Sequence, residues 1–146
     1  MTTQATQILR QVSEAGDVPA AHTRNYGLIL GRAALSFIFI LSGFGKIFSF
    51  AGTAGYMELQ GFFLAPFFLV AAILIEVLGG LSVLTGYKIK WGALALIVFL
   101  IPASLIFHNF WTLEGAAQQQ EMISFLKNIS ILGGLVYIRS TSRGDL

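Results

Sequence analysis

Four long apolar segments dominate this sequence and limit the folds that it can adopt. They cover roughly residues 26-50, 64-86, 91-107 and 122-138. Each is near the length of about 20 residues that an α-helix needs to cross about 30 Å of hydrocarbon. A bilayer offers no water to backbone N–H and C=O groups, so each segment must pair them internally, as a helix does. Four spans cannot close a barrel, and we therefore expect an all-α fold, a bundle of four transmembrane helices.

The composition agrees with a membrane protein and excludes several other classes. Of the 146 residues, 55% are hydrophobic and only 11% are charged, which is outside the usual range of soluble domains. The formal net charge of +2 is small, and it is not gathered into a basic stripe, so we expect no nucleic-acid partner. The sequence has no cysteine. Disulfides, thiol redox centres, iron–sulfur clusters and cysteine-based zinc sites are therefore excluded.

The basic residues predict how the chain is oriented in the membrane. Those near the helix ends fall in the N-terminal region, in the loop after the second span and at the C-terminus: Arg10, Arg24, Lys88, Lys90, Arg139 and Arg143. Four spans place these three regions on one side, and the positive-inside rule then puts both termini in the cytoplasm. We expect a polar leader over 1-25, a transmembrane domain over 26-138 and a cytoplasmic tail over 139-146.

Glu76 is an anomaly, because it interrupts the apolar run 73–81. It precedes Lys88 by twelve residues, and Lys127 precedes Arg139 by the same number. At about 1.5 Å per residue, both side chains lie about 18 Å from the cytoplasmic face. An unpaired charge at the helix centre costs about 2.5 to 3.5 kcal/mol on insertion scales. We therefore expect Glu76 to face Lys127 inside the bundle.

Other polar groups extend this predicted cluster. Arg32 lies about 9 Å from the inner face, where its side chain either reaches toward Glu76 or extends to the headgroups. Asn128 and Ser130 add hydrogen-bonding groups beside Lys127. Two interpretations stay open: the pair fixes helix packing, or the cluster forms the polar floor of a pocket that opens outward.

Lys46 and His108 form a second polar group, which we expect near the outer face. Lys46 ends the first span and His108 ends the third. We expect each to meet water or to pair with an acidic residue of the outer loops, namely Glu58, Glu114 or Glu121.

Glycines indicate where helices approach one another closely, as membrane interfaces require. The sequence offers three closely spaced pairs, which are Gly27 and Gly31, Gly79 and Gly80, and Gly133 and Gly134. They predict a compact bundle and no ligand.

Two further sequence patterns superficially resemble cofactor-binding sites but do not meet the requirements of such sites. The stretch 42–46, Ser-Gly-Phe-Gly-Lys, lacks the spacing of a phosphate-binding loop and follows no strand. The two histidines, His22 and His108, fall on opposite sides of the membrane and cannot jointly bind a metal or haem. We therefore expect no metal, haem or nucleotide, and no catalytic residue.

Several runs together resemble a known family. These runs are residues 30–47, 75–81, 84–87, 107–111 and 125–130. They contain Arg32 and then Ser-Gly-x-x-Lys in the first span, Glu76 in the second, His108 at the end of the third, and Lys127 with Asn128 in the fourth. In this order they are similar to the DoxX family of small bacterial membrane proteins. The resemblance covers about residues 28–138 and implies four helices in the bacterial cytoplasmic (inner) membrane. Some relatives are associated with thiosulfate:quinone oxidoreductases or with membrane complexes that handle oxidative stress.

These observations favour a non-enzymatic membrane component. We expect it to bind a small lipophilic or anionic molecule, with a quinone as one candidate, and to act with protein partners in membrane redox or oxidative-stress physiology. A membrane subunit of a quinone-linked oxidoreductase is an alternative, although its electron donor would need a partner. A small-molecule transporter, which would require a homo-oligomer, and a structural scaffold are further alternatives.

Overall fold

The computed structural model describes residues 4, 6–7 and 26–142, and this part of the chain contains helices and no strand. The elements from residue 26 onward are α2 (Tyr26–Phe48), α3 (Phe50–Leu59), α4 (Ala65–Thr85), α5 (Ile89–Phe107), the 3₁₀ turn η1 (Phe110–Thr112) and α6 (Gly115–Thr141). Four of them, α2, α4, α5 and α6, are long and apolar enough to cross a membrane. The predicted all-α bundle of four transmembrane helices is confirmed. The expected leader, apart from positions 4, 6 and 7, lies outside the described residues.

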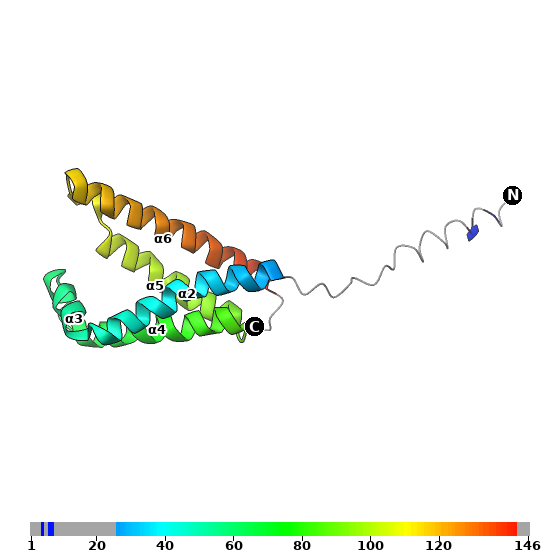
Figure 1. Ribbon diagram of the computed structural model, residues 1–146, viewed down its shortest axis with the longest axis horizontal. Coiled ribbons are helices and arrows are strands. Elements are labelled where there is room, and N and C mark those ends of the chain that lie inside the picture. The colour runs from blue at the N-terminus through cyan, green and yellow to red at the C-terminus, as the bar shows by residue number, and fades with distance from the viewer. Residues whose placement is uncertain (1–3, 5, 8–25, 143–146) are drawn as a thin grey trace.

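The four long helices run roughly along the long axis of the bundle, and α6 diverges from the others toward one end (Figure 1). Helix α2 packs on α4, α4 on α5, and α5 on α6. Helix α2 begins and α6 ends at the same end of the bundle, which we call the terminal end. The short helix α3 lies across the opposite end, the α3 end. Our predicted orientation places the terminal end in the cytoplasm.

Two boundaries differ from those that hydropathy predicts. The first span was expected to reach residue 50, but α2 ends at Phe48 and the chain turns at Ser49 into α3. The fourth span was expected to begin at 122, but α6 begins at Gly115. Its first turns contain alanine and glutamine, which favour helix, and the three consecutive glutamines and Glu121 lower the hydropathy of this stretch. A hydropathy window reports the apolar part of a helix and misses this polar extension.

The turn between α4 and α5 is tight, and the sequence supplies the residue that it needs. Gly86 ends α4 at φ 83°, a left-handed conformation that glycine adopts without steric cost. Lys88 follows with φ 47° and is the N-cap of α5. Pro66 stands in the first turn of α4, where its missing N–H costs no hydrogen bond.

Glycines of α4 set the close contacts between helices. A Cβ atom on Gly79 would lie 2.8 Å from Leu96 Cγ of α5, and one on Gly80 would lie 2.9 Å from Ile40 Cγ1 of α2. Both sites leave no space for a side chain, so the prediction for this pair is confirmed. It is wrong for Gly31 and Gly133, which face open space.

The buried apolar residues form two clusters. One joins α2, α4, α5 and α6 toward the terminal end and consists of Phe39, Val83, Ile89, Ala93, Leu96, Leu100 and Leu135. The other joins α3 to the start of α4 and consists of Ala54, Met57, Ala65 and Leu69. A cavity borders both clusters, and it contains the polar groups described next.

Candidate binding site

Glu76 lies inside the bundle and is held by α2. Glu76 as a whole residue is only 4% exposed. Lys46 Nζ lies 2.9 Å from Glu76 Oε2 and 3.0 Å from Oε1. Ser42 Oγ donates to Oε1 at 3.0 Å and accepts a hydrogen bond from Lys46 Nζ at 2.6 Å. The carboxylate is therefore neutralised by a cation and a hydroxyl from the neighbouring helix.

The predicted pair of Glu76 with Lys127 is wrong, because the cation that answers Glu76 is Lys46. Gly43 brings α2 against α4, where a Cβ atom would lie 2.6 Å from Val77 Cγ2 and 3.5 Å from Glu76 Cβ. Ser42 therefore faces Glu76, and Lys46 stands one helical turn further on. Its four-carbon side chain is long enough to reach back over the roughly 5.4 Å of that turn.

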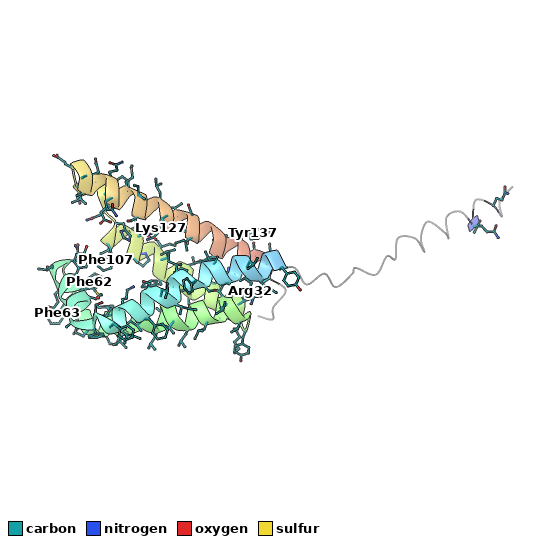
Figure 2. All side chains as sticks on the ribbon, in the orientation of Figure 1. Arg32, Phe62, Phe63, Phe107, Lys127 and Tyr137 are labelled. Atoms are coloured by element: carbon teal, nitrogen blue, oxygen red, sulfur yellow. The ribbon has the colours of Figure 1, made fainter. Side chains whose placement is uncertain are left out.

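Of the two predictions for Arg32, the approach to Glu76 is wrong, because its side chain points instead toward the terminal end of α4. Its Nε donates to Val83 O at 2.9 Å and its Nη2 to Leu84 O at 3.0 Å. Figure 2 shows it near the terminal end, far from Lys127 along the bundle. These carbonyls belong to the last turn of α4, where cations are favourable. Arg32 thus caps the end of α4.

The adjacent residues Lys127 and Asn128 have different surroundings. Asn128 is buried and donates to Ser104 Oγ of α5 at 3.1 Å, while Ser104 donates to Leu100 O at 2.7 Å. Lys127 is exposed. In the part of the chain that the structure describes, it has no hydrogen bond and no ion pair. The predicted cluster is therefore divided: Asn128 joins α6 to α5, and Lys127 is an unpaired cation.

His108 lies at the α3 end and pairs with one of the three candidate acids. Its Nδ1 is 2.7 Å from Glu121 Oε2, and both side chains are partly exposed. The contact links the end of α5 to the early turns of α6. Lys46, in contrast, pairs with none of the loop acids.

A cavity of about 580 Å³ brings these groups together. This volume is in the range of small-molecule sites, about 300 to 1,000 Å³. Its polar wall consists of Ser42, Lys46, Thr53, Glu76, His108, Lys127 and Asn128. The remaining wall is mainly apolar, with aromatic rings from Phe39, Tyr56, Phe62, Phe68, Phe99 and Phe107. Such a site, apolar with a few convergent polar groups, is typical of a binding pocket.

Aromatic side chains cover the cavity at the α3 end. The rings of Phe62 and Phe107 stack with centroids 5.7 Å apart and an interplanar angle of 11°. Tyr56 of α3 packs against Phe107 at 5.9 Å. Figure 2 shows Phe62 and Phe107 between α3 and α5, whereas Phe63 points away from the bundle. Helix α3 and its following loop therefore form a cover over the cavity.

Sequence reasoning missed Ser42 and the aromatic cover. Ser42 and Lys46 are four residues apart, and that spacing places two side chains on one helix face. Polar groups in a membrane helix face the protein interior, so this pair was a usable signal for the side of α2 that meets Glu76. The cover carried no comparable signal, because stacking of Phe62 on Phe107 depends on how the loop folds.

Metal ligation finds no support in the described residues, where no group of three or more histidines and carboxylates comes together. The polar wall consists instead of groups that donate and accept hydrogen bonds. Lysine, serine and asparagine donate, and the Glu76 carboxylate accepts. The arrangement can hold and orient a molecule.

Fold and site together define a small integral membrane protein with four transmembrane helices and a polar pocket within the bundle. The model of the DoxX family matches residues 27–109, more than half of the chain. The protein belongs to the DoxX family.

Its relatives include two inner membrane proteins of Escherichia coli K12. YphA is 31% identical over 119 residues, which cover 82% of this chain and 85% of the relative. YqjF is 33% identical over 118 residues, with 81% and 85% covered. A Surfeit locus protein 4 homolog of Schizosaccharomyces pombe is 26% identical over 144 residues, 95% of this chain and 43% of the relative. No solved structure matches significantly. The two Escherichia coli relatives and the four apolar helices identify the chain as a multi-pass protein of the bacterial inner membrane.

Proposed function

We propose that this protein is a non-enzymatic component of the inner membrane that binds a small lipophilic or anionic molecule in the cavity of the α3 end. It acts with partner proteins in membrane redox or oxidative-stress physiology. The observation that carries the proposal is the combination of one roughly 580 Å³ cavity with Lys46, Glu76 and Lys127 in its wall.

A packing role alone accounts for only part of this wall. The Lys46–Glu76 pair, with Ser42, would fix α2 against α4 without any cavity. Protein interiors are close-packed, and voids larger than a water molecule are few. Packing of the Lys46–Glu76 pair does not require this cavity, and a bound ligand would account for both its volume and the unpaired lysine in its wall.

A quinone is a candidate for this ligand. Its ring carries carbonyl acceptors that match the unused donors of Lys127, and its flat face matches the aromatic wall. Its lipophilic tail would remain in the bilayer. Because the chain has no cysteine, electrons for any redox reaction would come from a partner protein.

Thermal unfolding with and without a short-chain quinone tests this function. A ligand at 100 times its Kd stabilises the folded state by about 2.7 kcal/mol, so the Tm of the wild-type protein should rise. Ala72 lines the cavity one helical turn from Glu76, and Ala72→Phe should fill the site and abolish the rise. Val70→Phe, at a position outside the cavity lining that is 47% exposed, is the matched control and should retain it. No rise in Tm, or an equal rise in Ala72→Phe, contradicts a quinone site in this cavity.

A quinone-linked oxidoreductase subunit is the second candidate. It is favoured by the presence of Lys46, Glu76 and His108 in one cavity wall, because these residue types serve as general acids and bases and quinone reduction consumes protons. Quinone reduction by the purified protein with a chemical electron donor would favour an enzyme. Reduction only after a membrane fraction is added would assign the chain to a complex.

A further inference from the structure

We propose that the ligand of the cavity is an amphiphile of a specific kind: its head group carries an anion for Lys127 and an O–H or N–H donor for Glu76 Oε2. Its tail leaves the bundle between α2 and α6. This inference rests on the proposed function and narrows the class of ligand.

The anion follows from the charges of the cavity wall. Lys46 and Glu76 neutralise each other, with Nζ within 3.0 Å of both carboxylate oxygens. Glu121 does not neutralise Lys127, because it pairs with His108 and lies outside the cavity lining. Lys127 therefore leaves an excess of one positive charge in the wall. An ammonium group has three donors and no acceptor, and in an apolar region an anionic group is its most favourable partner.

The donor follows from the second oxygen of Glu76. Oε2 is fully buried and accepts no hydrogen bond, although Lys46 Nζ lies 2.9 Å away as an ion pair. Oε1 takes both bonds that the described residues supply, from Ser42 and from Lys46. An ionised carboxylate only accepts hydrogen bonds, and the ion pair with Lys46 compensates the charge of Oε2 without giving it a hydrogen bond of good geometry. A hydroxyl or amine on the ligand would satisfy it.

The path of the tail follows from the way α6 diverges from α2. Near the terminal end the helices meet, where a Cβ atom on Gly134 would lie 3.4 Å from Leu35 Cδ1. Toward the α3 end they spread apart (Figure 1). Ile38 of α2 and Ile131 of α6 line the cavity, and Ile38 is 38% exposed. An apolar tail between these residues would continue directly from the cavity into the bilayer.

Four probes with one tail length separate the two requirements. They are 2-hydroxydodecanoate, with anion and donor; dodecanoate, with the anion alone; 1,2-dodecanediol, with donors alone; and methyl dodecanoate, with neither. We would measure their dissociation constants by native mass spectrometry of the protein in phosphatidylcholine nanodiscs. The affinity should be highest for 2-hydroxydodecanoate, followed by dodecanoate, and lowest for the ester.

Two variants assign the effects to atoms. Lys127→Met should lower the affinity for both acids about 10- to 100-fold, since a hydrogen bond to a charged group contributes about 1.5 to 3 kcal/mol. The affinity for the diol should not change. This variant removes a charge from a membrane helix, so it should insert and fold at least as well. Glu76→Gln should lower the affinity ratio of 2-hydroxydodecanoate to dodecanoate from about tenfold toward one. Lys90→Met, outside the cavity lining, is the control and should change neither quantity.

A membrane lipid could supply the same chemistry as a free amphiphile, since phosphatidylglycerol carries both an anion and hydroxyls. If this lipid is the natural ligand, it should compete for the site, and nanodiscs that contain it should lower the apparent affinity for 2-hydroxydodecanoate. Unchanged affinity would assign the site to a free amphiphile, and both results support the head-group chemistry.

Equal affinity for acids and ester, or unchanged acid binding in Lys127→Met, overturns this inference. The proposed function survives that result if quinone stabilisation is still abolished by Ala72→Phe. If none of the four probes binds and quinone gives no shift, both proposals fail.

Discussion

Two lysines line the same cavity, and we expect them to differ in their effect on the free energy of unfolding. Lys46 pairs with a carboxylate whose side chain is only 5% exposed, while its own is 25% exposed. Lys127 has no ion pair within the described part of the chain. Removal of one partner of a buried pair leaves an uncompensated charge, which costs about 3 to 5 kcal/mol.

We therefore expect Lys46→Met to lower the free energy of unfolding by about 3 kcal/mol, near the lower limit because Lys46 is partly exposed. Lys127→Met should leave this energy unchanged or raise it slightly. Unfolding in mixed micelles, followed by circular dichroism, measures both.

The double variant Lys46→Met with Glu76→Leu completes the test. It removes both charges, so it should recover most of the stability lost in the single variant. Equal losses in Lys46→Met and Lys127→Met would show that Lys127 also neutralises Glu76 and would contradict the pairing described here.

The sequence was informative about Glu76 and misleading about its partner. A carboxylate in the middle of a membrane helix is too costly to face lipid, so its burial follows from its position alone. Its partner depends on how α2 is rotated and how far it is shifted along α4, and Gly43 and Val77 set both through their contact. Depth along a helix cannot distinguish two lysines when one side chain spans a full turn.

At the level of helices, the small residues of α4 determine how closely its neighbours approach. A Cβ atom on Gly79 would lie 2.8 and 2.9 Å from Cγ and Cδ2 of Leu96, which is fully buried and cannot move aside. Gly31 of α2 meets nothing within 4 Å. Two glycines in membrane helices thus differ completely in their surroundings.

Gly79→Ala should lower the free energy of unfolding by about 1 to 3 kcal/mol through overpacking between α4 and α5. Gly31→Ala is the matched control and should leave stability unchanged or raise it by up to about 1 kcal/mol, because alanine favours helix. The same micelle unfolding experiment measures both variants. A loss of equal size at Gly31 would refute the proposed role of the close contact.

Hydropathy predicted the four spans well and the α3 end poorly. The apolar segments follow directly from the thickness of the bilayer. The break at Ser49 and the early start of α6 at Gly115 occur where the chain is no longer apolar throughout. The cover over the cavity is made from α3, which follows the break at Ser49, and from the loop after it, so its geometry could not be derived from hydropathy.

At the scale of the whole molecule, the orientation in the membrane stays a prediction from the basic residues. The absence of cysteine allows a direct test, because a single introduced thiol is the only one in the chain. Gln118 and Thr141, both exposed, stand near opposite ends of α6.

With a membrane-impermeant maleimide, Gln118→Cys should be labelled when only the periplasm is accessible. Thr141→Cys should be labelled only after the inner membrane is opened. The opposite pattern would invert the bundle and place the α3 end, with its cavity, on the cytoplasmic side.

The cavity is the feature that the whole molecule is arranged around. One apolar cluster closes the bundle near the terminal end, the other holds α3 over the start of α4, and the polar wall lies between them.

The most direct test of this account is to identify what occupies the cavity in the cell membrane. Native mass spectrometry of the protein, extracted with its surrounding lipid into polymer nanodiscs, would detect bound small molecules in the wild type, in Ala72→Phe and in Val70→Phe. We expect a stoichiometric amphipathic molecule in the wild type and in Val70→Phe, and its loss in Ala72→Phe. The same set of bound molecules in all three, or none in the wild type, would contradict the proposal that the cavity is a binding site.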